Sequence, residues 1–300
     1  MISRFAPSTT GEAHPGTLLS ALLVWLDARS RGGRVLLRLE DLDTTRVKTA
    51  WADALVEACT WLGLDWDATI VQSDRRAAHE AALDRLAAAD RLYACTCSRS
   101  SRSGGRRAPD GGWVYPNTCR ANVVVDWRTR DAASAIRVRL PDDRIELIDD
   151  GGEDLSQTPA TEMGDPIVVR KDGVIAYQLA VVVDDHDEGI TDVVRGRDIA
   201  PSTATQVMLQ RLLGYATPRY KHHFLLLEPH GEKLAKLHGS IPFSSVRAKY
   251  DARALSSVLG RVANLGEGTP REMLATFDWA KVPRDDVVVR WDDGLHFASR

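Results

Sequence analysis

The sequence predicts an α/β fold with an open sheet, and three stretches carry this prediction. The first stretch begins with an apolar strand at residues 2–6, turns through a segment rich in Pro, Gly and Thr, and enters an apolar helix near Thr17. The second is a buried strand at 34–39 followed by a helix around 49–64. The third is a buried helix and a buried strand within 177–196. Strands that alternate with helices in this way indicate an α/β fold.

The first turn, at residues 6–16, has the composition of a phosphate-binding loop. Backbone N–H groups left open in the first helical turn, together with the positive end of the helix dipole, favour an anion there. Gly11 and Gly16 allow an anion to approach closely, and His14 adds a hydrogen-bond donor. An ordinary βα turn with a solvated His14 explains the loop equally well when the loop is taken alone.

The composition is that of an ordinary globular chain, with 44% hydrophobic and 27% charged residues. Its 300 residues suffice for one large α/β domain with an insertion, or for two domains. Apolar runs are too short to cross a bilayer, and the first motif begins too early for a signal peptide. We therefore expect a cytoplasmic protein that does not bind membranes.

Nucleic-acid binding by this chain would depend on a local patch of charge. Lys and Arg number 39 against 42 for Asp and Glu, a net charge of −3, so the chain has no overall basic field. The best local candidate is residues 98–107, which hold four arginines and no acidic residue. We interpret this segment as a grip on an RNA backbone, although a solvated loop explains its composition at least as well.

Charged side chains follow two of the predicted strands, where a binding edge is expected. Glu40, Asp41 and Asp43 come directly after the strand at 34–39, and ligands of open α/β sheets lie beyond the carboxyl ends of strands. A carboxylate there can pair with a substrate ammonium group, or the cluster can cap the helix that follows. Arg195 closes a later strand, and its planar guanidinium suits a carboxylate.

Three of the four cysteines gather around one long loop, as Cys95, Cys97 and Cys119. In a cytoplasmic chain this favours a metal site over disulfides, and thiolate ligands select zinc. A closed structural zinc site has four ligands, so three cysteines leave the set incomplete, and unpaired core thiols are the alternative. We interpret the fourth cysteine, Cys59, as a small core residue.

The remaining patterns predict elements with a structural role only. A helix at 76–91 carries His79, which we place on the solvent side. The Asp172-Gly173 pair between apolar runs predicts a hairpin. Other expected strands lie at 123–125, 135–140, 145–148, 220–227 and 287–291, and other expected helices at 201–213, 252–264 and 270–277.

Three motifs occur in a fixed order: Pro-Ser-x-x-Gly-x-x-His-x-Gly-x-Leu at 7–18, Arg-Leu-Glu-Asp-Leu-Asp at 38–43 and Lys-Leu-Ala-Lys at 233–236. Together they resemble the catalytic domain of class I glutamyl-tRNA synthetases, whose "HIGH" and "KMSKS" signatures match the first and last motif. Cys-x-Cys at 95–97, followed by Tyr-x-x-x-Cys-Arg at 115–120, resembles the zinc site of the glutamyl-Q tRNA(Asp) synthetases, a short branch of that family.

The resemblance, which covers residues 4 to about 236, implies a Rossmann-type class I aminoacyl-tRNA synthetase catalytic domain with a zinc-containing insertion and a small, mainly helical C-terminal region. The corresponding expected domains are 1–92 for the first Rossmann half, 93–165 for the insertion, 166–237 for the second half with its KMSKS-like loop, and 238–300 for a C-terminal region that resembles a stem-contact region. The sixty or so residues after Lys236 are too few for the anticodon-binding domain of full-length glutamyl-tRNA synthetases, so we expect none.

The resemblance also implies roles for individual residues. Arg4 and Ser8 are expected to hold the carboxylates of glutamate, Glu40 to take its ammonium group, and Tyr177 and Arg195 to line the same pocket. The full implied glutamate set is Arg4, Phe5, Ala6, Pro7, Ser8, Glu40, Tyr177 and Arg195. The implied ATP contacts are His14, Gly16 and Lys236, and the implied catalytic set is these three with Lys233. The implied zinc ligands are Cys95, Cys97, Tyr115 and Cys119, which would hold one structural Zn²⁺ per chain.

The reaction that the resemblance implies has two steps. The carboxylate of L-glutamate attacks the α-phosphate of ATP, with Mg²⁺ as the counter-ion, and gives glutamyl-adenylate and pyrophosphate. The glutamyl group then passes to queuosine in the anticodon of tRNA(Asp). Expected partners are therefore L-glutamate, ATP and tRNA(Asp) carrying queuosine, and we expect a monomer.

Two departures from the family pattern keep alternatives open. Thr9 stands where the family usually has proline, and Ala235 stands where it usually has serine, which removes one hydroxyl contact from the lysine motif. One alternative is a truncated glutamyl-tRNA synthetase that charges the 3′ end of a tRNA. The other is an inactive synthetase paralogue that acts as an RNA-binding module.

Overall fold

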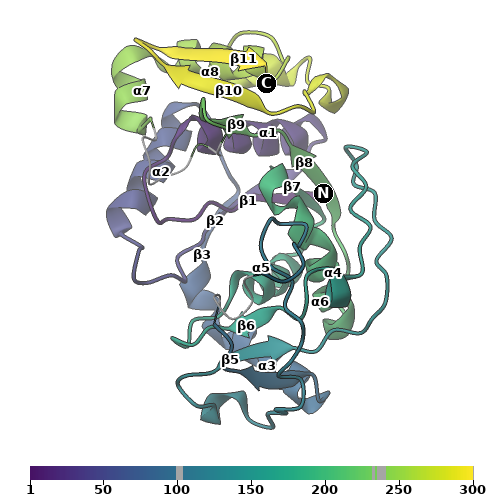
Figure 1. Cartoon of the computed structure of the whole chain (residues 1–300). Coiled ribbons are helices and arrows are strands. Elements are labelled where there is room, and N and C mark those ends of the chain that lie inside the picture. Colours follow the sequence, from purple (N-terminus) through teal and green to yellow (C-terminus); the bar gives the residue numbers. More distant parts are fainter. Residues whose placement is uncertain (99–103, 232–233, 235–240, 300) are drawn as a thin grey trace. The chain divides into compact units, whose positions relative to one another are not determined.

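The computed structural model describes residues 1–98, 104–231, 234 and 241–299 (Figure 1). The chain forms two compact units. The first contains Met1–Gln72, Ile190–Arg197 and Arg219–Arg300, and the second contains Ser73–Gly189 and Asp198–Pro218. Within the described residues, no helix combines the length and the apolar character that crossing a membrane requires.

A five-stranded parallel sheet is the centre of the first unit. Its strands are β1 (Ile2–Phe5), β2 (Arg34–Leu39), β3 (Ala68–Val71), β7 (Asp192–Gly196) and β8 (Arg219–His223), in the order β3-β2-β1-β7-β8. Each neighbouring pair is parallel. Because successive strands are added outward on both sides of the β1–β7 pair, the strand order switches between these two strands. The parallel sheet confirms the expected α/β class.

Helix α1 (Pro15–Ser30) begins with proline at its first position, where the missing N–H costs nothing. Eleven of its 16 residues are buried, which suits a helix that is apolar all round. Together with α2 (Thr49–Trp61), it contributes side chains to one large hydrophobic core in the first unit. The cysteine of α2, Cys59, is 2% exposed in this core, which confirms its predicted role.

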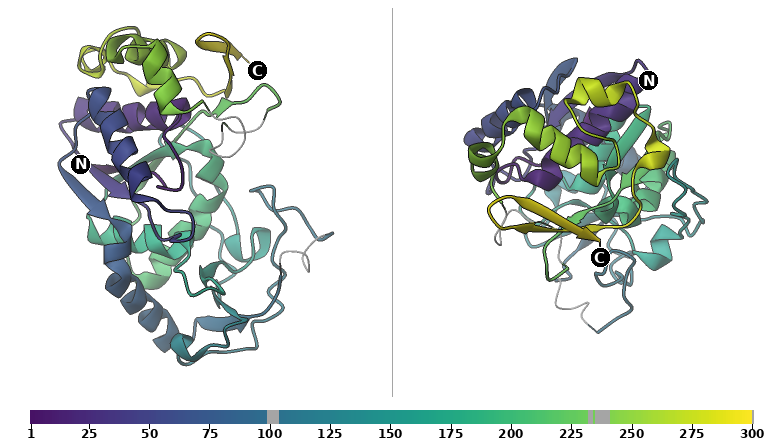
Figure 2. Two further views of the ribbon diagram at one scale, coloured as in Figure 1. Left: turned by 90° about the vertical axis from the view of Figure 1, so that its left-hand side faces the viewer. Right: turned by 90° about the horizontal axis from the view of Figure 1, so that it is seen from above.

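The C-terminal elements of the first unit add to the same core. In Figure 2 the yellow-green helices lie beside the purple helix α1, and Leu255, Leu259 and Val289 share its hydrophobic cluster. These elements are α7 (Phe243–Lys249), α8 (Ala252–Val262), α9 (Pro270–Leu274), the short helix η5 (Trp279–Lys281), and a sheet of β9 (Leu226–Leu227), β10 (Val287–Trp291) and β11 (Leu295–Ser299).

The second unit holds a three-stranded antiparallel sheet and four α-helices among its described residues. The sheet has the order β4 (Leu92–Cys95), β5 (Ala135–Val138) and β6 (Ile167–Val169). The predicted hairpin follows β6, where Gly173 adopts a φ of +86° and Val169 pairs with Ile175. The helices are α3 (Arg76–Ala88), α4 (Pro159–Glu162), α5 (Tyr177–Asp187) and α6 (Thr203–Leu213), with short η1 (Gln72–Arg75), η3 (Trp127–Thr129) and η4 (Arg197–Ser202) nearby in sequence.

Two of the strands predicted between 121 and 166 are not strands. Val123 and Ile148 each form a single isolated bridge, and Val125 is 88% exposed. A turn directly follows each of these segments, because an aspartate carboxylate binds backbone N–H groups there and ends the extended run. Asp126 accepts from the N–H of Arg128, and Asp149 accepts from those of Gly151 and Glu153.

The predicted solvent position of His79 is wrong. Its side chain is 0% exposed, and its Nε2 lies 2.7 Å from Oδ1 of Asp184, which is also 0% exposed. The two residues belong to α3 and α5, which pack together. The alanine-rich sequence of α3 leaves little hydrophobic contrast between its faces, so the pattern cannot tell which face carries His79.

We expect His79→Ala to lower the free energy of unfolding by about 3 kcal/mol, because the buried Asp184 carboxylate loses its imidazole partner. Urea denaturation followed by circular dichroism would measure this change. Arg76→Ala on the same helix is the matched control: Arg76 pairs with Glu80 at 2.8 Å but its side chain is 64% exposed, so its loss should cost less than about 0.5 kcal/mol. Equal effects of the two variants would contradict a special role for the buried pair.

Candidate functional site

Two buried arginines mark the point where the strand order switches. Arg4 lies on β1 and is 3% exposed, and Arg195 lies on the neighbouring strand β7 and is 5% exposed. Ligands of open α/β sheets bind beyond the carboxyl ends of the strands at such a switch point. A buried guanidinium is also the usual partner for a carboxylate in a protein interior.

The loop after β1 is fastened to the end of β2 by backbone hydrogen bonds. Thr9 donates to the carbonyl of Glu40 through its N–H at 3.1 Å and through its hydroxyl at 3.2 Å. Glu40 in turn donates its N–H to the carbonyl of Pro7 at 3.1 Å, and Ser8 forms a parallel bridge with Glu40. Ser8 and Glu40, both expected in the glutamate set, are therefore held side by side. Thr9, which departs from the family pattern, itself makes two of the hydrogen bonds that hold this loop.

The carboxylate of Glu40 has a buried cation behind it. Arg38, which is 0% exposed, places its Nε 3.8 Å from Oε1 of Glu40, whose side chain is 12% exposed. Arg38 and Glu40 lie two residues apart along β2 and its extension, so they share one face of the sheet. The ion pair holds the carboxylate beside the edge where ligands bind.

Arg195 is oriented by two residues of the adjacent strand β8. Its Nε donates to Nε2 of His222 at 3.1 Å, and its guanidinium carbon lies 5.1 Å from the ring centroid of Tyr220. Arg195 and His222 are paired in the parallel register, and the His222 ring stacks on that of Tyr220. The sequence analysis did not identify this contact. The available signal was that both residues end neighbouring strands.

The phosphate-binding loop ends at the first turn of α1. His14 is the N-terminal cap, is 7% exposed, and accepts the N–H groups of Thr17 and Leu18 at its carbonyl at 2.8 and 3.1 Å. A Cβ on Gly16 would lie only 3.1 Å from both Cε1 and Nδ1 of the His14 ring. Glycine at this position thus allows the imidazole to lie against the start of the helix, as the His-x-Gly spacing requires.

The other residues of the expected set belong to several elements of the chain. Tyr177 is the first residue of α5 in the second unit. Phe5 belongs to the hydrophobic core and lines an apolar pocket, so its side chain serves packing. Ala6 and Pro7 are half-buried in the loop after β1. Lys233 and Lys236 lie outside the described residues, as do Arg99 and Arg102 of the arginine segment.

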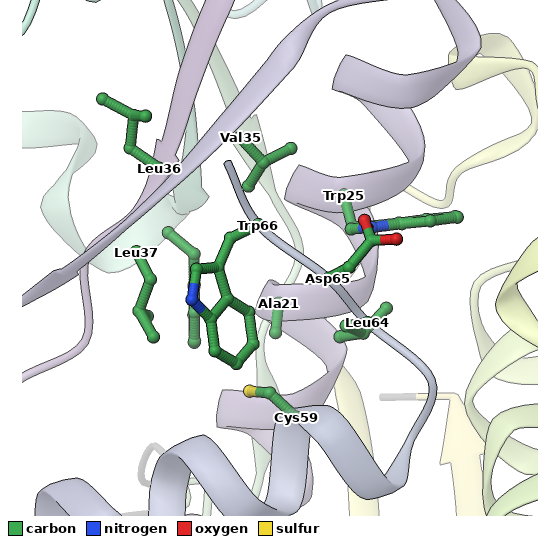
Figure 3. A pocket seen from close by; sticks show the side chains of 10 residues that line it. Ala21, Trp25, Val35, Leu36, Leu37, Cys59, Leu64, Asp65 and Trp66 are labelled. Atoms are coloured by element: carbon green, nitrogen blue, oxygen red, sulfur yellow. The ribbon is translucent and has the colours of Figure 1, made fainter. Parts of the chain in front are cut away.

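The apolar pocket that Phe5 lines is a core feature between α1, α2, β2 and residues 64–66 (Figure 3). Trp66 and Cys59 both point into it, and the Trp25 indole N–H donates to Asp65 at its rim at 2.9 Å. Burial raises the pKa of the Cys59 thiol to about 12, so it stays protonated at neutral pH. This thiol is therefore a packing group.

A second cluster, in the second unit, brings three cysteines together. The Sγ atoms of Cys95, Cys97 and Cys119 all lie within 4.8 Å of one another, and those of Cys97 and Cys119 are 3.6 Å apart. The hydroxyl of Tyr115 lies 3.4 Å from Sγ of Cys95. Sulfur atoms bound to one tetrahedral zinc ion at about 2.3 Å are separated by about 3.8 Å, so this donor set fits zinc. Among the described residues, these cysteines are the one group of three or more possible metal ligands. We refer to Cys95, Cys97, Cys119 and Tyr115 together as the metal cluster.

The surroundings of Cys97, Cys119 and Tyr115 affect the pKa values of these groups in different ways. A hydrogen bond with Tyr115 lowers the pKa of Cys119 to about 7, whereas burial raises the pKa of Cys97. Burial also raises the pKa of Tyr115, which is 1% exposed beneath the guanidinium of Arg137. Metals bind thiolates, so the lowered pKa of Cys119 favours metal binding at this thiol.

Asp165 is a buried carboxylate that ties the segments of this metal cluster together. It accepts from the Tyr93 hydroxyl at 2.8 Å and from Arg120 through two nitrogens at 2.7 and 2.8 Å. It also accepts the N–H of Leu140 at 2.9 Å. Tyr93 precedes Cys95 by two residues and Arg120 follows Cys119 directly, so one carboxylate fixes both arms that carry ligands.

Gly164 makes room for the same arrangement. It adopts a φ of +84°, and a Cβ there would lie 2.2 Å from the carbonyl oxygen of Tyr115. Tyr115 donates its N–H to the carbonyl of Met163 at 3.0 Å, so the two chain segments pass in close contact. Only glycine satisfies both the conformation and the contact.

A parallel sheet with a helix N-terminus at its switch point is the arrangement of a nucleotide-binding domain. The model of the tRNA synthetases class I (E and Q), catalytic domain, matches residues 1–264. The chain belongs to this family of ATP-using ligases.

Several curated relatives within this family share one name. A glutamyl-Q tRNA(Asp) synthetase from Symbiobacterium thermophilum is 39% identical, with 96% of this chain and 95% of the relative covered. Another from Thiobacillus denitrificans is 46% identical, with 78% and 77% covered. Among solved structures, a glutamate tRNA ligase from Elizabethkingia meningosepticum in complex with its amino acid has a TM-score of 0.78 at 25% identity. The match covers 96% of this chain but 66% of that ligase.

We expect Asp165→Asn, which keeps the shape and removes the charge, to weaken Zn²⁺ binding about 10- to 100-fold, because the arms that carry Cys95 and Cys119 lose their common anchor. Competition with a chromophoric chelator would measure the affinity. Asp149→Asn is the matched control, since Asp149 is also buried in this unit and its carboxylate accepts the N–H groups of Gly151 and Glu153 in its own turn. Unchanged Zn²⁺ affinity in Asp165→Asn would contradict the positioning role.

Proposed function

We propose that this protein activates L-glutamate with ATP and transfers the glutamyl group to queuosine in the anticodon of tRNA(Asp). The observation that carries the glutamate part is the pair of buried arginines, Arg4 and Arg195, on neighbouring strands at the switch point of the sheet. The name of the curated relatives supports the choice of RNA and acceptor base.

Glutamate offers two carboxylates and one ammonium group, and the site offers groups of opposite charge. In this proposal Arg4 and Ser8 hold carboxylate oxygens, and Arg195 supplies a second guanidinium. Glu40 pairs with the ammonium group, held in place by Arg38 behind it. Tyr177 keeps the glutamate-contacting role that the family resemblance implies.

The first chemical step needs alignment more than covalent participation by the protein. The α-carboxylate must approach the α-phosphate in line, and the phosphate gains negative charge as the bond forms. The positive end of the α1 dipole and His14 supply positive potential at the loop. Lys233 and Lys236 are assigned by resemblance to neutralise the departing pyrophosphate, with Mg²⁺ as the ATP counter-ion.

The metal cluster has a structural role in this proposal. Cys95, Cys97, Tyr115 and Cys119 hold one Zn²⁺ per chain, which fills all four tetrahedral positions with protein ligands. Such a site leaves no position open for substrate. The proposed domain scheme is unchanged from the sequence: Rossmann halves at 1–92 and 166–237, the zinc-containing insertion at 93–165 and the C-terminal region at 238–300.

A second candidate function is charging the 3′ end of a tRNA with glutamate, which the structural similarity to a glutamate tRNA ligase favours. The decisive test is glutamylation of three purified RNAs: tRNA(Asp) with queuosine, tRNA(Asp) without it, and tRNA(Glu). We expect product with the first alone. Product on tRNA(Glu) would favour the second candidate instead.

Pyrophosphate exchange with glutamate and ATP, in the absence of any tRNA, tests the first step separately. The family resemblance implies that full-length glutamyl-tRNA synthetases need tRNA for this exchange and that the short branch does not. We expect exchange without tRNA. No exchange under any condition would identify an inactive paralogue that serves as an RNA-binding module.

We expect His222→Ala to raise the KM for glutamate in this exchange about 10- to 100-fold, because Arg195 loses the acceptor that orients its guanidinium. The KM for ATP should change little. His222→Gln, which offers a side-chain oxygen as acceptor, should recover most of the glutamate affinity. An equal loss in both variants would show that the ring matters only for packing.

We expect Gly16→Ala to slow pyrophosphate exchange at least about tenfold, because the new methyl group displaces the His14 ring from the helix start. The melting temperature should hold or rise, since alanine favours the helix by up to about 1 kcal/mol over glycine. Unchanged exchange in a folded variant would contradict the role assigned to His14.

A further inference from the structure

Residues 106–114 form an exposed hairpin in the second unit, between the two arms of the metal cluster. Arg107 and Trp113 pair in an antiparallel bridge. Ala108 donates its N–H to the carbonyl of Gly112 at 3.0 Å, and Gly111 donates to Ala108 at 2.9 Å. Gly111 adopts a φ of +79°, which closes the turn. These bonds give the hairpin a defined shape although most of its residues are exposed.

The guanidinium group of Arg107 stacks on the indole ring of Trp113 in this hairpin. The guanidinium carbon of Arg107 lies 3.8 Å from the ring centroid of Trp113. Nη1 of Arg107 donates to the carbonyl of Gly111 at 2.8 Å, which holds the guanidinium in its stacked position. Arg107 is exposed and Trp113 is half-buried, so a planar cation backed by an indole faces water.

The hairpin is anchored at its base rather than at its tip. Arg106 donates to the carbonyl of Thr161, and Val114 donates its N–H to the carbonyl of Arg106 at 3.0 Å. The next residue, Tyr115, belongs to the metal cluster and is bonded to Met163. The stack therefore has a supported base, and Arg107 is itself the last residue of the arginine-rich segment 98–107.

We propose that the Arg107–Trp113 stack is a platform for an unstacked base in the anticodon loop of the substrate RNA. Bases splayed from a loop stack on aromatic rings and on arginine planes. A base that must reach an active site leaves the stack of its own loop, which exposes the faces of its neighbours. Arg107 supplies both a stacking plane and a charge for the RNA backbone. This inference rests on the proposed RNA substrate and deepens it.

The test is binding of a fluorescent tRNA(Asp) anticodon stem-loop to the full chain at several salt concentrations. Trp113→Ala should weaken binding about tenfold or more with an unchanged salt slope, because stacking is lost and no charge is removed. Arg107→Ala should weaken binding and reduce the salt slope by about one. Arg107→Lys should keep the slope and still lose affinity, since lysine has charge without a plane. Trp113→Phe should recover most of the affinity.

Controls separate this inference from the proposed function. Arg144→Lys changes an exposed arginine of the same unit, paired with Glu146 at 2.8 Å, and should bind like the wild type. Pyrophosphate exchange should be unchanged in every hairpin variant, because none of the proposed ATP or glutamate contacts lies there. If Trp113→Ala and Arg107→Lys both bind RNA like the wild type, the platform is refuted while glutamylation still stands. If the wild type neither binds nor glutamylates RNA, the proposed function itself fails.

Zn²⁺ content and melting temperature of each variant exclude a folding defect as the cause of lost affinity. Should Trp113→Ala lose Zn²⁺, Arg107→Lys decides alone, because its side chain contributes nothing to the metal cluster. Weaker RNA binding by this variant supports the platform, and wild-type binding overturns it.

Discussion

The pairing of β1 with β7 is the constraint on which the candidate active site depends. Ser3 and Asp192 are the register pair between these strands, and both lie near the amino ends of their strands. Asp192 is clamped there by Arg31 at 2.8 Å and by Arg219 at 2.6 Å. Burial raises the pKa of Asp192, but hydrogen bonds from Thr191, Arg219 and Arg31 outweigh it and hold the pKa below its usual range. The amino end of this strand pair is thus fixed by ion pairs, and the carboxyl end carries the candidate site.

Much of the scaffold of the first unit could be predicted because its signals are local. The strand at 34–39 matches β2 to the residue, since an apolar run with turns on either side has one compact conformation. The phosphate-binding loop and α1 follow from glycine, proline and an apolar helix in sequence. His79 could not be placed, because its partner Asp184 lies 105 residues away and nothing within α3 points to it.

The site was predictable where residue type alone dictates chemistry. Three cysteines in one loop indicate a metal cluster, and the structure gathers them as expected. The role of Asp165 in holding the cysteine-bearing segments was not predictable, because its partners Tyr93 and Arg120 come close to it only in the folded chain. The orientation of Arg195 by His222 depends on the register of two parallel strands, which a sequence does not state. Residues with a reactive or charged side chain are thus easier to predict from the sequence than the contacts that orient them.

The position of Asp165 has a consequence for the order in which the protein is made. Tyr93 precedes it by 72 residues, so both ligand-bearing arms leave the ribosome well before the carboxylate that joins them. N-terminal segments emerge first during synthesis, and long-range contacts wait for their later partner. Cys95, Cys97 and Cys119 therefore pass through a period as exposed thiols in the nascent chain. The contacts of Asp165 that join the two arms therefore form only once translation has passed residue 165.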